Sequence, residues 1–334
     1  MKILLSLGLV GLACATGAYL WVDRALSPVE EAGPGARVVS FEVERGEPFG
    51  RVAASLEAEG LIRDARVTRW FARAEKIASQ VKVGEYELST GQSTPEILDT
   101  LVKGRVRTHE VVIPEGQRAS EIADRLAAAG LADRDAFLAV VHDSSMPERL
   151  DVEGTSLEGY LFPDTYRFAR GLAPEQIAEA MVDEFHRVYA SLSVDDDTAL
   201  SMKEIVTLAS IVEKETGAEE ERPLIAAVFL NRMKRGMRLE TDPTVIYGIE
   251  NFDGNLRRVH LQDGTNPYNT YRIRGLPPGP IASPGREALR AVLEPADTPY
   301  LYFVSRNDGT HVFSKTYAEH KARVDEFQRR RRRR

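Results

Sequence analysis

The apolar residues between Lys203 and Pro223 recur at a helical spacing. Counted from Ile205, they form one broad stripe with a period of about 3.6 residues, and Thr216-Gly217 ends the pattern. Glu213 and Glu215 lie on opposite shoulders of this stripe, about 200° apart around the helix, so they cannot both face one cleft. Either both are solvated carboxylates, or one is a partly desolvated general acid whose pKa is raised by apolar neighbours.

A second apolar pattern is the uncharged run of 20 residues from Ile3 to Val22, which is long enough to cross a bilayer. Lys2 precedes it, so the positive-inside rule places residue 1 in the cytoplasm. We therefore predict an uncleaved transmembrane anchor over residues 1–24. A cleaved signal peptide and a lipoprotein signal at Cys14 are the alternatives. They are weakened because no Ala-x-Ala site follows the run and no Leu stands three places before the cysteine.

Residues 25–37 are rich in Pro, Gly and Glu and are predicted to be a linker. An internal repeat follows, in which five residues recur after a shift of 70: Gly46, Ala53, Leu56, Gly60 and Leu61 correspond to Gly116, Ala123, Leu126, Gly130 and Leu131. Each copy is a β-rich run, a Gly turn and an amphipathic helix. A third, partial copy starts at Gly91. The copies are too few for a solenoid, so we predict a small module over residues 38–107. This module resembles LysM peptidoglycan-binding modules, and a plain packing module is the alternative.

The second half of the chain alternates helical patterns with aromatic loops. An amphipathic helix is predicted over 172–189, a largely buried helix over 224–234, a hairpin over 300–304 and 311–314, and a polar helix over 317–328. The loops EGYLFPDTY, LETDPTVIYG and NPYNTYRIRGLPPGPIAS combine rings with hydrogen-bonding groups, as sugar-binding clefts do. The candidate binding residues are Glu158, Tyr160, Asn231, Asp242, Thr244, Tyr247, Tyr268, Asn269, Thr270 and Tyr271.

Charge and composition exclude several classes of protein. The net charge is −7 although residues 329–334 are six arginines, so the rest of the chain is more acidic still. An acidic body argues against nucleic acid as a partner, and we interpret the arginines as a solvated tail. The six histidines form no ligand-spaced pair and Cys14 is the only cysteine, so no metal site is expected. No nucleotide or dinucleotide fingerprint is present, and no cofactor is expected.

Several motifs occur in one order: VIPEGQ, EGYLFPDTY, SIVEKET, VFLNRM, DPTVIYG, YNTY, GLPPGPI, YFV and HVFSKT. Together they resemble the YceG/MltG-like family of endolytic murein transglycosylases over nearly the whole chain. The resemblance implies cleavage of the β-1,4 bond between N-acetylmuramic acid and N-acetylglucosamine in nascent glycan strands. It also implies that residues 108–328 are the catalytic domain, that Glu213 is the catalytic acid, and that peptidoglycan synthases (penicillin-binding proteins) are partners.

One carboxyl group is enough for this chemistry, because the C6 hydroxyl of the muramic acid attacks C1 and closes a 1,6-anhydro ring without water. Glu213 would first protonate the leaving oxygen and then accept the C6 hydroxyl proton. Asp242 is a candidate for stabilising the positive charge at C1, and a turn or cap residue before Pro243 is its alternative role.

The sequence therefore predicts an α+β protein with an N-terminal transmembrane helix, a LysM-like module and a catalytic domain outside the inner membrane. A non-catalytic scaffold that binds peptidoglycan is one alternative, and it would bind glycan without forming an anhydro product. A muramidase that uses Glu213 and Asp242 is another, and it would leave an ordinary reducing end.

Overall fold

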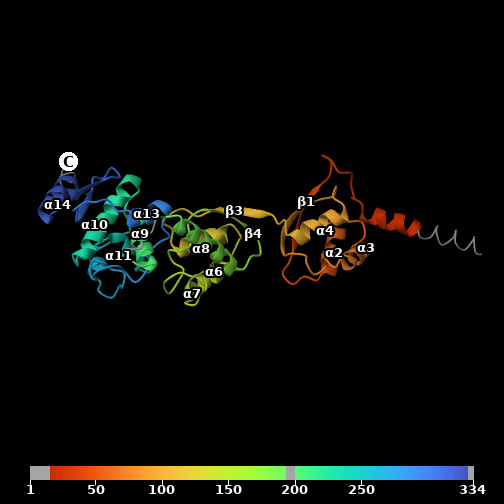
Figure 1. Cartoon of the computed structure of the whole chain (residues 1–334), viewed down its shortest axis with the longest axis horizontal. Helices are drawn as coiled ribbons and strands as arrows, with labels where there is room; N and C mark the ends of the chain where they lie inside the picture. The colour runs from red at the N-terminus through yellow and green to blue at the C-terminus, as the bar shows by residue number, and fades with distance from the viewer. Residues whose placement is uncertain (1–15, 193–199, 330–334) are drawn as a thin grey trace, which may run out of the picture. The chain divides into compact units, whose positions relative to one another are not determined.

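The computed structural model describes residues 16–192 and 200–329, which form two compact units. Unit 1 comprises the chain up to His109 together with residues 167–172. Unit 2 comprises residues 110–166 and the chain from Ala173 onward. Helices and three small two-stranded sheets make up both units, so the predicted mixed α+β class is confirmed. Figure 1 follows the chain from red to blue.

Unit 1 is built on an antiparallel pair of strands with two helices between them in the sequence. Its elements are β1 (Val38–Val43), α2 (Phe49–Ala58), α3 (Ala65–Ala74), β2 (Gly84–Ser89) and α4 (Thr94–Lys103). Phe41 pairs with Tyr86 at the centre of the sheet. Both side chains are buried with Leu56, Leu98 and Leu101 in one apolar core. Burial of this apolar face is what holds so small a unit together.

The internal repeat is visible in the backbone. Gly46 and Gly116 both have positive φ before helices α2 and α5, and Gly60 and Gly130 both have positive φ after them. In each copy the following leucine donates its N–H to the carbonyl five residues earlier, at 2.9 Å. The left-handed conformation is accessible to glycine because it has no Cβ. The repeat therefore encodes the same two turns around the same helix.

The similarity extends one helix further than the sequence pattern indicated. Asp64 caps α3 after the first copy, and Asp133 caps α6 after the second. Each carboxylate accepts a hydrogen bond from a backbone N–H of the first helical turn. The strands that flank the second copy are β3 and β4, which pair with each other.

Unit 2 places helices around the central helix α9. Its helices are α5 (Ala119–Ala128), α6 (Arg134–Val141), α7 (Met146–Arg149), α8 (Pro174–Ala190), α9 (Met202–Glu215), a 3₁₀ turn (Glu219–Glu221), α10 (Arg222–Lys234), α11 (Asp242–Tyr247), α12 (Arg258–Gln262), α13 (Arg286–Leu293) and α14 (Tyr317–Val324), which runs on as a π-helical turn (Asp325–Arg329). Strands β5 (Tyr302–Ser305) and β6 (His311–Ser314) also belong to unit 2, whereas β3 (Thr108–Val112) and β4 (Thr165–Ala169) each contain residues of both units. Helices α10, α11 and α13 all contact α9.

The central helix forms as its periodicity predicts. Ser201 caps α9 in a capping box with Glu204, and the helix ends at Glu215 because Thr216 has extended backbone angles. Residues 205–212 are all buried, including the polar Thr207 and Ser210. The helix is therefore a core element, and its first and last turns reach the protein surface.

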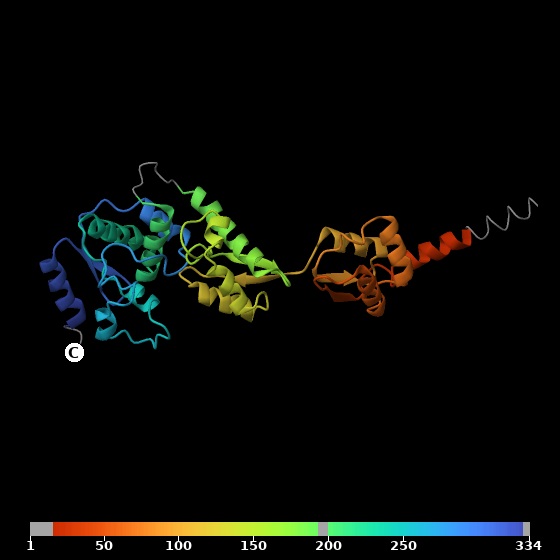
Figure 2. The same ribbon diagram turned by 90° about the horizontal axis from the view of Figure 1, so that it is seen from below.

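The predicted C-terminal hairpin is also confirmed. Strands β5 and β6 pair antiparallel, with Phe303 opposite Phe313. Helix α14 contacts both strands and lies at the dark-blue end of the chain in Figure 2. The hairpin is joined to the 3₁₀ turn by Glu221, which accepts the backbone N–H of His311 at 2.8 Å and contacts its ring Nδ1 at 2.6 Å.

The predicted membrane anchor is not supported. Within 16–192 and 200–329, no helix is both long enough and apolar enough to span a bilayer. Residues 16–26 are helical. The prediction of a single-pass inner-membrane protein is therefore corrected. Residues 1–15, with Cys14, and most of the arginine tail (330–334) lie outside the described residues.

Candidate active site

The last turn of α9 carries two carboxylates in different surroundings, as the helical wheel required. Glu213 points toward α13 and the start of α10, where it meets Gly285 and Arg222. Glu215 points toward the segment before α11, where it meets Thr241. The helix thus holds the two groups on separate sides of its axis, and Glu215 lines a cavity.

Glu213 is bound on both oxygens inside the protein. Its Oε1 accepts a hydrogen bond from Nη2 of Arg222 at 3.0 Å, and its Oε2 accepts the backbone N–H of Gly285 at 3.1 Å. The side chains of Glu213 and Arg222 are each only 7% exposed, so this is a buried ion pair. Both oxygens of Glu213 therefore have a donor inside the protein, and the ion pair fastens the end of α9 to the start of α10.

Glu115 completes this cluster at the surface. Its Oε2 lies 3.5 Å from Nη2 of Arg222, and its side chain covers Gly285, where a Cβ would collide with the carboxyl group. Burial and the negative charge of Glu213 both raise the pKa of Glu115. One arginine therefore compensates two carboxylates, and it ties the start of α10 to α9 and to the turn before α5.

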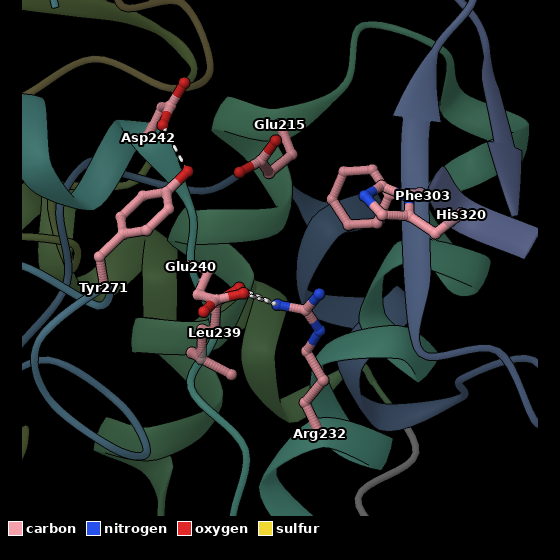
Figure 3. A pocket seen from close by; sticks show the side chains of 8 residues that line it. All are labelled: Glu215, Arg232, Leu239, Glu240, Asp242, Tyr271, Phe303 and His320. Atoms are coloured by element: carbon pink, nitrogen blue, oxygen red, sulfur yellow. Dashed lines mark hydrogen bonds and ion pairs between the residues drawn. The ribbon is translucent and has the colours of Figure 1, made fainter. Parts of the chain in front are cut away.

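Glu215 lines a cavity of about 330 Å³ together with residues from α10, α11, the hairpin and α14. Figure 3 shows the carboxyl group of Glu215 directed toward Asp242 and Tyr271. The hydroxyl group of Thr241 donates a hydrogen bond to its Oε1. No cation forms an ion pair with Glu215 among the described residues, so its charge is less compensated than that of Glu213.

These surroundings raise the pKa of Glu215 to about 7, chiefly because burial disfavours the charged form. The negative charge of Asp242 acts in the same direction, whereas the Thr241 hydroxyl, His311 and Arg232 oppose it. A carboxyl group with a pKa near neutrality is protonated for about half of the time at pH 7, so it can both donate and accept a proton.

The opposite wall of the cavity holds Asp242 and Tyr271. The Tyr271 hydroxyl donates a hydrogen bond to Oδ1 of Asp242 at 2.8 Å. Asp242 is the first residue of α11, and its neighbour Thr241 is the N-cap, with no side-chain capping bond. The negative charge of Asp242 therefore faces the cavity instead of capping the helix.

Arg232 supplies the positive charge of this cavity. Its guanidinium donates to the carbonyls of Leu301 and Leu239, each at 2.7 Å, and lies 3.5 Å from Oε2 of Glu240. Glu240 has a φ of 55°, which is rare for a residue with a side chain. His320 lines the same wall, and its buried Nδ1 has no hydrogen-bond partner among the residues that the structure describes. Burial and Arg232 lower the pKa of His320, so it is neutral at pH 7.

Glu158, the first residue of EGYLFPDTY, is buried in a different place. Its Oε1 accepts the N–H of Ala119 at 3.0 Å, and its Oε2 accepts the hydroxyl of Tyr247 at 3.1 Å. Burial raises the pKa of this carboxyl to about 7. Glu158 thus joins the start of α5 to the end of α11. It touches no cavity described here.

Most other predicted binding residues have their side chains bonded inside the protein. Tyr160 donates to the carbonyl of Glu153, Asn231 to those of Thr298 and Tyr300, and Asn269 to three carbonyls of residues 260–263. Thr244 and Thr270 bond to each other and to Thr241. These side chains shape the loops, and the cavities are lined by their neighbours. Tyr268 is half-buried, with its ring centre 4.7 Å from that of Tyr247.

A second cavity, of about 500 Å³, is also lined by residues of α9 and α11. It is lined by Arg118, Ser120, Glu121, Lys214, Pro243, Ile246, Ile249, Asn251, Phe252 and Ile281. The two cavities share no lining residue, yet consecutive residues line them: Lys214 and Glu215 on α9, and Asp242 and Pro243 on α11. The two cavities are therefore neighbours at the end of α9 and the start of α11.

Sequence reasoning missed Arg222, Arg232 and the lining of the second cavity. Arg222 follows a run of three glutamates, which made it resemble a solvated charge, and it becomes buried because α10 begins there. No group of three or more metal-ligating side chains occurs in the part of the chain that the structure describes.

The first cavity combines a carboxyl group that titrates near neutrality with a second carboxylate held by a tyrosine hydroxyl. This combination defines an acid–base site of the kind that bond-cleaving enzymes use. The sequence pattern of the YceG-like family matches residues 41–326, and the chain belongs to that family.

Relatives resemble the chain over most of its length. It is 29% identical to the endolytic murein transglycosylase of Bacillus subtilis, over 93% of this chain and 90% of the relative. It is 28% identical to the protein of the same name from Streptococcus pneumoniae, where it spans 92% of its own length but only 61% of the relative. A crystal structure of a yceG-like protein from Listeria monocytogenes shares 30% identity and a TM-score of 0.56, covering 85% of this chain and 98% of the other.

Proposed function

We propose that this chain is an endolytic murein transglycosylase whose general acid and base is Glu215. The observation that carries the proposal is the pKa of about 7 of a carboxyl group that lines an open polar cavity. The family and the names of the relatives support murein as the substrate. The bond cleaved is then the β-1,4 bond from N-acetylmuramic acid to N-acetylglucosamine.

The reaction needs one group that gives and then takes back a proton. Protonated Glu215 donates its proton to the leaving O4 as the C1–O4 bond breaks. The C6 hydroxyl of the muramic acid then bonds to C1 and passes its proton to the Glu215 carboxylate. The products are a free 4-hydroxyl and a 1,6-anhydro ring. No water is consumed and the enzyme regains its starting protonation.

Asp242 is suited to stabilise the positive charge that develops at C1. It lines the same cavity as Glu215, and the hydrogen bond from Tyr271 fixes its carboxylate. A carboxylate that a hydrogen bond holds in place stabilises a cationic transition state more strongly than mobile solvent does. The same carboxylate raises the pKa of Glu215. Glu215 can therefore act as the acid while Asp242 stays ionised and stabilises the positive charge.

The resemblance assigns the acid role to Glu213, and that assignment stays a prediction. The contacts of Glu213 favour a structural role, because Arg222 and Gly285 occupy both oxygens and its side chain lines neither cavity. Glu213 would then hold the end of α9 in place, so that Glu215 keeps its direction.

The first test is the chemistry of the product. Glycan strands are digested with the full chain and the released fragments are weighed by mass spectrometry. Fragments about 18 Da lighter than hydrolysis products contain the anhydro ring and support the proposal. Ordinary reducing ends would instead point to a muramidase in which Asp242 activates water. Glycan binding with no cleavage would favour the scaffold.

A pair of variants separates the two glutamates. We expect Glu215→Gln to abolish formation of anhydro ends while the thermal midpoint stays at or above that of the wild type, because a buried ionisable group is removed. We expect Glu213→Gln to lower the unfolding free energy by about 3 kcal/mol, because Arg222 loses its charged partner, while the folded protein retains activity. The reverse pattern, an inactive but stable Glu213→Gln and an active Glu215→Gln, would return the acid role to Glu213.

Unit 1 is proposed to bind the same polymer. Its element order β1-α2-α3-β2 is consistent with a LysM-like module, so residues 38–107 would hold glycan while residues 108–328 cleave it. Peptidoglycan synthases remain predicted partners, because an enzyme that cuts nascent strands needs their products.

A further inference from the structure

The second cavity is next to the proposed reaction site and differs from it in charge. The first cavity is lined by three carboxylates, Glu215, Glu240 and Asp242, against one guanidinium. The second is lined by two cations, Arg118 and Lys214, against one carboxylate, Glu121. The charges of the two cavities therefore orient a ligand that spans both of them, with its anionic part in the second cavity.

The two cations are not neutralised by partners of their own. The Arg118 guanidinium lies 5.1 Å from the centre of the Tyr247 ring, a cation–π contact that fixes its position but leaves its donors available. Lys214 donates from Nζ to the carbonyl of Gly116 at 3.1 Å. Among the described residues neither forms an ion pair. Oε2 of Glu121 accepts the backbone N–H of Arg118 at 2.8 Å.

An apolar wall faces these cations. Pro243, Ile246 and Ile249 from α11 and the turn after it are half-buried, as is Phe252, and they line the cavity together. Ile281 closes the floor, and its backbone N–H is held by Oγ of Ser210 at 3.0 Å. The cavity thus offers contact surface to alkyl groups and two charged donors to carboxylates.

We propose that this second cavity binds the carboxylated peptide substituent of the murein strand while the glycan lies in the first cavity. The inference rests on the proposed function for the identity of the polymer. A peptide of small residues with free carboxylates matches both the half-buried apolar wall and the two cations. Because consecutive residues of α9 and α11 line the two cavities, a peptide held by Lys214 fixes the sugar to which it is attached relative to Glu215.

The experiment measures binding to the full chain by titration calorimetry with three probes. These are the disaccharide N-acetylglucosaminyl-N-acetylmuramic acid without a peptide, the same disaccharide with a short peptide bearing free carboxylates, and that peptide with its carboxylates amidated. None contains the bond that the enzyme is proposed to cleave. We expect the carboxylated probe to bind about tenfold more tightly than the amidated one, because hydrogen bonds to charged groups are the stronger ones.

The variant Arg118→Gln/Lys214→Gln removes the two charges and should bind the carboxylated and amidated probes equally. Arg118→Lys keeps the charge and should retain most of the preference. The matched control is Arg306→Gln/Lys315→Gln, which removes two exposed cations that line neither cavity and should behave as the wild type. Equal thermal midpoints of all variants would verify folding.

Two results overturn the inference: a wild type that does not distinguish the carboxylated from the amidated probe, and a double variant that keeps the distinction. Both can occur in a protein that still forms anhydro ends, which leaves the proposed function intact. Carboxylate-dependent binding that depends on Arg118 and Lys214, in a chain that forms no anhydro ends, would support the cavity and refute the proposed reaction.

Discussion

At the scale of single residues, their different partners distinguish the two carboxylates of α9. Glu213 and Glu215 stand two positions apart on one helix, and both side chains are largely withdrawn from water. Glu213 meets an arginine and a backbone N–H, whereas Glu215 meets a hydroxyl group and a second carboxylate. Burial and the negative charge of Asp242 favour the protonated form of Glu215, and they outweigh the opposing hydrogen bond from Thr241.

The pH dependence of cleavage should follow from this difference. Glu215 has to be protonated when it meets the glycosidic oxygen, so kcat/KM should fall as the pH rises through about 7. Asp242→Asn removes a negative charge that raises this pKa, so the alkaline limb should move to lower pH. Glu250→Gln removes an exposed carboxylate outside the first cavity and should leave the limb in place. A limb that stays fixed in Asp242→Asn would contradict the assignment.

Glu158 gives a prediction for stability. Its folded-state pKa is raised to about 7, so between about pH 4.5 and 7 the folded state binds more protons at this site than the unfolded state. The unfolding free energy should therefore decrease as the pH rises through this window, by up to roughly 3 kcal/mol. The unfolding free energy is measured by urea unfolding at pH 5 and at pH 8. Glu158→Gln should make the difference between these two values smaller, because the titration of Glu158 no longer contributes to it. Glu175→Gln, at an exposed position of α8, is the control and should not change the slope.

At the scale of elements, the repeat shows how far local sequence determines local structure. The two copies share five residues, and both fold into a positive-φ glycine, a ten-residue helix and a second positive-φ glycine. The periodicity of the apolar residues sets each helix, and the glycines set both turns. The carboxylate caps of α3 and α6 then start the next helix in the same way.

The helix-ending glycines can be tested directly. Gly60→Ala and Gly130→Ala should each lower the unfolding free energy by about 1–2 kcal/mol, because φ is +69° and +67° at these positions and the left-handed region is unfavourable for alanine. Gly33→Ala is the control, since φ is not positive there and no atom lies within 4 Å of the added Cβ. Equal midpoints of denaturant unfolding for all three variants would refute the role given to these turns.

At the scale of the whole molecule, each unit contains one full copy of the repeat, and the two cavities both lie in unit 2. Every residue that lines the two cavities lies between Arg118 and His320 and belongs to unit 2. The chemistry of the site therefore depends on the packing of α9, α10, α11 and the hairpin, and on no residue of unit 1.

A fragment of residues 108–329 should therefore fold and retain the site. We expect a cooperative thermal transition by circular dichroism and formation of anhydro ends on short soluble strands. Co-sedimentation with insoluble murein should decrease several-fold, since unit 1 is proposed to supply part of the avidity. Unchanged co-sedimentation would mean that unit 1 is a packing module and not a glycan-binding one.

The sequence by itself determined the elements of this protein and its family. The 3.6-residue stripe set α9, the alternating apolar runs set the β5–β6 hairpin, and the ordered motifs indicated the YceG-like family, because each of these signals is local to its segment. It also placed Glu213 and Glu215 on opposite sides of one helix.

Only the tertiary structure decided the surroundings of those two side chains. Arg222 reaches Glu213 because α10 starts beside α9, and Asp242 and Tyr271 reach Glu215 because α11 and its following loop fold against the same turn. Likewise, the cation pair Arg118 and Lys214 is formed from residues 96 positions apart. The pKa of Glu215 and the charge of the second cavity both depend on residues that are distant in the chain. No local sequence pattern could therefore predict them.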